Sequence, residues 1–394
     1  MNRTNWWYKA IYVIAVVLLT EGCLQTFYRL STGSYLISRD TPPIYSSDPV
    51  SGWTNMPSLS YRHVTPEFIA DIYTNSQGFR VSSHHEEYEH PRPGNIFRIL
   101  LLGPSFAFGW GVNYEDTFGA QLQETLAKTG IANGTRVEVL NHGVPYQSPA
   151  NGLDWFKARG KDYGPNLVIQ FIYGSLEVEA VPDTSITVSD GHIILKASGM
   201  GAQIWSYAKM SATVFYSGVI VGLIHKSLFH EDSIERIDGA GRHMRNSRGF
   251  ELDDLPVKRS LVFYKNLKRT VEETGARLLL VYFPLAYIVH PEDRTRWALH
   301  GVENIDSQIE FNQMFASYLN ENGIRCLNLT EFFIDAARKG NGRLYYWLDI
   351  HWTKLGNVVA AKSVTQYLAE QSSLLPEPEM RVIKQVSTAP VSTQ

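Results

Sequence analysis

Near-continuous apolar runs, separated by segments with helical periodicity, constrain the fold of this 394-residue chain more than any other feature. The runs predict strands over residues 97–102, 137–140 and 167–172. Strands buried on both faces have such continuous Leu, Val and Ile runs, whereas half-exposed strands alternate apolar and polar residues. Helices between strands of this kind cover both faces of the sheet. We therefore expect an α/β fold with three layers and a mostly parallel sheet.

The segments between and after these runs support the same fold class. Phe118, Leu122 and Leu126 recur every four residues, which is typical of a helix with one buried face. Gly275 and Gly323 each follow a predicted helix and precede a predicted strand, where a left-handed cap residue is expected. The predicted helices cover residues 117–127, 260–273 and 309–320, and the later strands cover residues 277–283 and 324–328.

A serine early in the chain and an Asp-x-His pair late in it carry the chemistry. The first strand ends in the small-residue turn Gly103-Pro104-Ser105, which would expose the Ser105 hydroxyl at the carboxyl edge of the sheet. Residues two apart in an extended segment face the same way, so the Asp349 carboxylate can reach Nδ1 of His351. A serine nucleophile needs a base, and the base needs a group that orients it. These residues predict a catalytic triad of Ser105, His351 and Asp349.

The same residues resemble the sequence blocks of the SGNH (GDSL-type) esterase superfamily, and the resemblance covers most of the chain, from about Tyr61 to Leu368. Residues 103–112 resemble the first block, Gly-Asp-Ser, except that Pro104 replaces the aspartate. Asn141-His142-Gly143 resembles the second block, Asn-x-Gly. Tyr173-Gly174-Ser175 stands at the third block, Gly-x-Asn, with serine in place of asparagine.

The last block and the upstream segment narrow this resemblance. Asp349-Ile350-His351 has one residue between Asp and His, where the superfamily usually has two, and this spacing is similar to that of alginate-type polysaccharide O-acetyltransferases. Residues 73–80 resemble the lead-in segment of membrane-anchored bacterial members. The resemblance implies a flavodoxin-like SGNH fold and a serine esterase or O-acetyltransferase that acts on acyl, most simply acetyl, esters of an envelope or secreted polysaccharide.

The resemblance also implies an oxyanion site. Its donors would be the backbone N–H groups of Ser105 and Gly143, together with the third-block side chain near Gly174. Loss of one such donor costs about 3–4 kcal/mol of transition-state stabilisation when nothing replaces it. Ser175 is shorter than asparagine, so the Tyr173 hydroxyl or a water is an alternative donor. Two interpretations stay open: an active enzyme, or an inactive subunit of this fold that binds glycan or supports an assembly complex.

Composition restricts the partners. The net charge of −3 gives no reason to expect binding to nucleic acid, and the two cysteines, Cys23 and Cys326, predict no disulfide framework. Triad chemistry requires no metal and no organic cofactor. The expected partners are an acylated glycan or small ester as substrate, a membrane, and a polysaccharide-modification machinery.

The N-terminus predicts the compartment. Arg3 and Lys9 precede the apolar run 10–20, and the wider segment 6–28 is long enough to span a bilayer with aromatic residues at both ends. This pattern favours a single-pass inner-membrane anchor with the catalytic part in the periplasm. A cleaved signal peptide and lipidation at Cys23 are the alternatives, although Glu21 fits a lipidation site poorly and also lies awkwardly near the far boundary of a span.

The expected organisation has four parts, one of them interrupted by an insertion. An Asp190-Gly191 turn predicts a hairpin early in the insertion. The apolar segment 212–224 is too short to cross a bilayer and is expected to form a buried or lid helix near Ser105. The parts are an anchor or signal helix (1–30), an irregular juxtamembrane segment with short strands (31–95), a catalytic domain (96–372, with the insertion 180–255), and a disordered tail (373–394).

Overall fold

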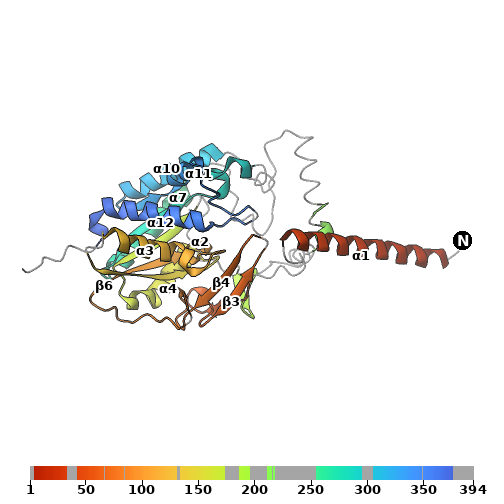
Figure 1. The fold of residues 1–394 in the computed structure, drawn as a ribbon, viewed down its shortest axis with the longest axis horizontal. Helices are drawn as coiled ribbons and strands as arrows, with labels where there is room; N and C mark the ends of the chain where they lie inside the picture. The colour runs from red at the N-terminus through yellow and green to blue at the C-terminus, as the bar shows by residue number, and fades with distance from the viewer. Residues whose placement is uncertain are drawn as a thin grey trace, which may run out of the picture.

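A central sheet of eight strands organises the molecule (Figure 1). The computed structural model describes residues 4–32, 42–65, 67–83, 85–130, 134–173, 186–195, 211–214, 216–217, 254–294, 305–347 and 349–375. The strands lie in the order β12-β11-β8-β6-β7-β5-β4-β3. Their bounds are β3 Ser60–Val64, β4 Ile69–Thr74, β5 Arg80–Val81, β6 Ile96–Gly103, β7 Arg136–Gly143, β8 Leu167–Tyr173, β11 Arg277–Phe283 and β12 Cys326–Asn328.

The five strands from β12 to β7 are parallel, and β5, β4 and β3 continue the sheet in antiparallel pairing. One apolar cluster packs one face of the sheet against α3 (Phe118–Thr129), α11 (Thr330–Arg338) and α12 (Lys354–Glu370). A second cluster packs the other face against α4 (Pro149–Ala158), α7 (Leu255–Glu272) and α10 (Ile305–Glu321). The predicted three-layer α/β fold with a mostly parallel sheet is confirmed.

Local signals placed several elements well. The predicted strand 277–283 coincides with β11, and Thr117 is the N-cap of α3, where its side chain accepts a hydrogen bond from the Ala120 N–H. Gly275 and Gly323 both have positive φ, as expected for left-handed caps. The sequence did not predict α4, α11 and α12. The buried face of α12 consists largely of Gly, Ala, Ser and Thr, so its apolar periodicity is weak.

The segment before β6 is built into the core rather than standing apart from it. Besides β3–β5, it forms the hairpin of β1 (Tyr45–Asp48) and β2 (Gly52–Asn55). The hairpin predicted within the insertion is present as β9 (Ile186–Ser189) and β10 (His192–Leu195), and it packs on β1–β2 through a shared apolar cluster. The rest of the predicted insertion helix lies outside the described residues beyond 212–214 and 216–217, as does the tail from 376.

The first helix, α1 (Thr4–Thr32), projects away from this body (Figure 1). Its stretch Trp7–Leu30 has 24 residues, and within it an 18-residue window has a mean hydropathy of 1.8 with only 6% of its residues buried, so length and composition suffice to cross a membrane. Glu21 on this helix accepts hydrogen bonds from the backbone N–H groups of Ala212 and Thr213, at 2.7 and 3.0 Å. It also accepts from the hydroxyls of Ser211 and Thr213, each at 2.8 Å. The side-chain amide of Gln25 donates to it as well, at 2.8 Å, so the carboxylate that fits a membrane span poorly has five donors.

The buried Arg98 of β6 provides a test of the sheet's stability. Its guanidinium is inaccessible to solvent and donates to Glu138 of β7 at 2.7 Å, and to the carbonyl oxygens of Glu89 and Tyr163.

Glu138→Ala leaves a buried cation without its carboxylate, so we expect a loss of about 3–5 kcal/mol in the free energy of unfolding, measured by denaturant titration. The control Glu124→Ala breaks an exposed pair with Lys128 and should cost about 0.5 kcal/mol or less. Equal losses in the two variants would contradict this account.

Candidate active site

Ser105 lies in a sharp turn at the carboxyl end of the central strand β6. Gly103 has φ +147°, and a Cβ there would lie 2.7 Å from Cβ of Phe171, so only glycine fits. Ser105 is the first residue of the short helix α2 (Ser105–Phe108), and Pro104 is its N-cap residue. An N-cap residue needs no N–H of its own within the helix, and the Pro104 carbonyl accepts from the N–H groups of Ala107 and Phe108. Pro104, which replaces the aspartate of the Gly-Asp-Ser block, is thus compatible with the turn.

The structure brings the three predicted triad residues together. Oγ of Ser105 lies 2.6 Å from Nε2 of His351, and Nδ1 of His351 is hydrogen-bonded to Oδ1 of Asp349. The same carboxylate oxygen accepts the backbone N–H of His351 at 2.9 Å. Burial acts to raise the pKa of Asp349, but the charge and hydrogen bonds of His351 outweigh burial and lower it. The carboxylate is therefore ionised at neutral pH, as an orienting group for a histidine must be.

Aromatic side chains hold the His351 ring. Its centroid lies 4.8 Å from the ring of Phe106 and 5.6 Å from that of Trp110. His63 of β3 packs edge-on against Trp110 at 4.9 Å. Burial lowers the pKa of His63 to about 4, although the charge of Asp349 acts in the opposite direction. This second histidine is therefore neutral at pH 7, and it adds an apolar, uncharged wall beside the triad.

The structure describes two of the residues predicted for the oxyanion site, Gly143 and Tyr173, besides Ser105. The Gly143 N–H donates to Oδ1 of Asn141 at 2.9 Å, and a Cβ on Gly143 would lie 2.1 Å from N of Phe108. Gly143 thus allows the nucleophile turn to pack on β7, and its N–H is already engaged. Tyr173 ends β8 with its ring stacked on that of Phe283 at 5.4 Å. Gly174 and Ser175 lie outside the described residues.

Glu67 and His63 belong to the site, and sequence reasoning missed both. Glu67 lies in the turn between β3 and β4, and its carboxylate accepts N–H groups from the loop that carries Asp349. Neither residue stands in a motif. Both residues reach the site because β3 and β4 pair with each other at the end of the sheet. No local pattern in residues 60–74 indicates that this strand pair lies beside the loop that carries Asp349.

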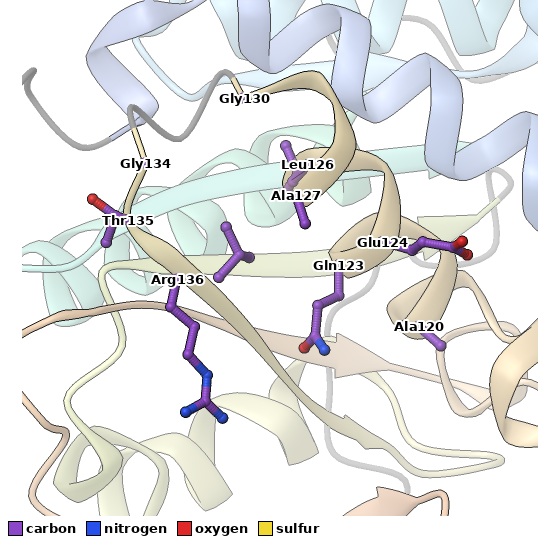
Figure 2. Close-up of a pocket in the computed structure, with 10 residues that line it drawn as sticks. Ala120, Gln123, Glu124, Leu126, Ala127, Gly130, Gly134, Thr135 and Arg136 are labelled. Atoms are coloured by element: carbon purple, nitrogen blue, oxygen red, sulfur yellow. The ribbon is translucent and has the colours of Figure 1, made fainter.

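One surface hollow lies far from these residues. It has a volume of about 540 Å³ and is lined by the last turns of α3 and the start of β7, including Glu124 and Arg136 (Figure 2). Arg136 pairs with Ile96 at the amino end of β6, whereas Ser105 follows the carboxyl end of that strand. The hollow is therefore at the opposite edge of the sheet from the triad.

Comparison with known families bears on this fold. Residues 246–392 match a family model described as "SGNH hydrolase-like domain, acetyltransferase AlgX". The mostly parallel sheet with helices on both faces is consistent with an SGNH fold. The matched region includes Asp349 and His351, whereas Ser105 lies upstream of it. The resemblance to SGNH hydrolases of the alginate-acetyltransferase type is thus confirmed, and the SGNH domain supports esterase or acyltransferase chemistry at the level of the family.

A curated relative carries a similar description. A "Probable alginate O-acetylase AlgJ" of Pseudomonas syringae pv. tomato is 27% identical over 134 residues, which are 33% of this chain and 32% of that protein. The match therefore spans about a third of the relative's length. This relative and the apolar helix α1 are compatible with a single-pass membrane protein.

Solved structures of the SGNH and lipase type are also similar. A putative lipolytic protein of the G-D-S-L family from Desulfitobacterium hafniense is 17% identical, with 68% of this chain and 98% of that chain covered at a TM-score of 0.35. The esterase EstA from Pseudoalteromonas sp. is 12% identical, with 70% and 99% covered at a TM-score of 0.37.

Proposed function

We propose that this protein is a membrane-anchored, extracytoplasmic serine enzyme that transfers or hydrolyses acyl groups, most simply acetyl, on a polysaccharide. The observation that carries the proposal is the 2.6 Å contact between Oγ of Ser105 and Nε2 of His351, with Asp349 on the other ring nitrogen. A serine, a base and an orienting carboxylate in this sequence of contacts form the arrangement that activates a hydroxyl for attack on an ester.

In the proposed reaction, Oγ of Ser105 attacks the acyl carbon while Nε2 of His351 takes the hydroxyl proton. His351 then gives this proton to the leaving alcohol, and an acyl-serine remains. In the second half, water or a sugar hydroxyl loses its proton to His351 and attacks the acyl-serine. Hydrolysis and transfer differ only in this acceptor. No metal or organic cofactor takes part in these steps.

The proposed oxyanion donors follow from the free N–H groups. The Ser105 N–H lies in the first turn of α2, where N–H groups have no acceptor within the helix. For Gly143 we propose a packing role, because its N–H would have to leave Asn141 before it could bind an oxyanion. Tyr173 is the last residue of β8, and it remains proposed as a substrate-side residue together with Gly174 and Ser175, which follow it in the sequence.

We further propose that α1 is an uncleaved inner-membrane anchor and that the SGNH domain is periplasmic. Support comes from the length and apolar composition of α1 and from the predicted position of Arg3 and Lys9 on the inner side. The description of the AlgJ relative as an alginate O-acetylase supports an acylated polysaccharide as substrate and a polysaccharide-modification machinery as partner. An inactive glycan-binding subunit is the second candidate, favoured by the engaged N–H of Gly143.

The test is acyl transfer by the full chain in detergent. The protein receives 4-nitrophenyl acetate as donor and an oligosaccharide as acceptor, and both nitrophenol release and acetylated sugar are measured. We expect nitrophenol release that Ser105→Ala eliminates, and acetylated sugar if transfer is the preferred outcome. Release that is equal in wild type and Ser105→Ala, over several donors, would support the binding subunit.

A further inference from the structure

Asp349 lies at the tip of a narrow loop. Tyr345 and Trp352 pair as an antiparallel bridge, and the Tyr346 N–H donates to the His351 carbonyl at 3.0 Å. The tip beyond this bridge is open to solvent, since Trp347 is 46% and Ile350 is 36% exposed. A short exposed tip has few buried contacts of its own, so other elements must hold it in place.

Glu67 contacts this tip from a distant part of the chain. One carboxylate oxygen accepts the Trp347 N–H at 2.6 Å, and the other accepts the Asp349 N–H at 2.8 Å. Both bonds join an ionised acceptor to backbone donors, and such bonds are stronger than neutral ones. A single side chain thus fixes the backbone on both sides of residue 348, immediately before the Asp349 carboxylate.

The turn that carries Glu67 is itself well held. Oγ1 of Thr65 accepts the N–H groups of Glu67 and Phe68, at 3.3 and 3.1 Å. The ring of Phe68 packs against that of Tyr346 at 5.1 Å, and the Tyr346 hydroxyl donates to the Gly111 carbonyl at 2.8 Å. The β3–β4 turn, the Asp349 loop and the segment after α2 therefore form one connected wall of the site.

We propose that Glu67 is a positioning residue for the triad: it holds the Asp349 backbone so that the carboxylate stays on Nδ1 of His351. The inference rests on the proposed function and deepens it. No hydrogen bond in the described part of the chain joins Glu67 to Ser105 or to the His351 ring, so its action passes through Asp349. Glutamine keeps one acceptor oxygen but presents an NH₂ group to the other N–H, and alanine leaves both N–H groups without this acceptor.

The experiment measures inactivation of the full chain by a fluorophosphonate probe, analysed as a maximal rate and a half-saturating concentration. We expect Glu67→Ala to lower the maximal rate about tenfold to a hundredfold, because a small displacement of a catalytic group has effects of this size. The half-saturating concentration should stay within about twofold, because Glu67 does not reach the probe. Glu67→Gln should fall between wild type and Glu67→Ala. Glu124→Ala, which removes an exposed carboxylate on α3, is the matched control and should behave as wild type.

A double-mutant cycle with Asp349→Asn separates positioning from general stability. If Glu67 acts through Asp349, then Glu67→Ala should cost little more in the Asp349→Asn background. Equal losses in both backgrounds would show a general structural role and overturn the inference, as would wild-type rates in Glu67→Ala. An unreactive wild type would instead overturn the proposed function, so the two failures are distinguishable.

Discussion

Replacing Ser105 with alanine should abolish covalent labelling of the protein by a fluorophosphonate probe. The probe forms a bond to an activated hydroxyl, and Ser105 is the hydroxyl within 2.6 Å of His351. His351→Ala should remove nearly all labelling, because the hydroxyl then has no base. Labelling is read as fluorescence of the protein band, and the modified peptide is identified by mass spectrometry.

Ser189→Ala is the matched control, since Ser189 is an exposed serine at the end of β9. It should be labelled as strongly as wild type. Full labelling of Ser105→Ala would show that another nucleophile reacts. Folded wild-type protein that no probe labels would favour the glycan-binding subunit.

Asp349→Asn should lower the rate of ester turnover by about 10⁴-fold while the protein stays folded. Asparagine has nearly the same shape, but it lacks the charge that stabilises an imidazolium and can hold the ring in the wrong tautomer. The loss corresponds to about 5.4 kcal/mol of transition-state stabilisation. Steady-state kinetics with an acetyl ester give the rate, and thermal unfolding reports the fold.

The control for loss of a charge is Asp335→Asn on α11, whose carboxylate makes an exposed pair with Arg338. This variant should keep wild-type turnover. A drop of less than tenfold in Asp349→Asn would show that the imidazole does not depend on this carboxylate and would remove Asp349 from the proposed triad.

The sequence was sufficient for features that depend on local pattern. Continuous apolar runs indicated β6, β8 and β11, and the Gly103-Pro104-Ser105 turn pointed to the carboxyl edge of the sheet. Asp349 and His351 were paired by their spacing alone. Each of these inferences needs only residues that are close in the chain, together with the rule that parallel strands end at one edge.

Features that depend on distant pairing could not be predicted. The Glu67 carboxylate meets the Asp349 N–H across 282 positions of sequence. This contact exists because β5 pairs with β7 in antiparallel register and so adds β4 and β3 to that edge of the sheet. Likewise, nothing near Gly143 in the sequence shows that its N–H is taken by Asn141. Which acceptor each of these N–H groups uses depends on side chains that only the folded structure brings together.

The contact between Glu21 and residues 211–213 also bears on how such a protein could be re-engineered or could evolve. A helix that served only as a tether could be exchanged for any apolar helix of similar length. Here the exchange would take away the acceptor of the Ala212 and Thr213 N–H groups and of the Ser211 and Thr213 hydroxyls. Helix α1 and the insertion are therefore interdependent. A chimaera with an unrelated membrane helix would keep the sheet and its covering helices but lose the hydrogen bonds that join α1 to residues 211–213.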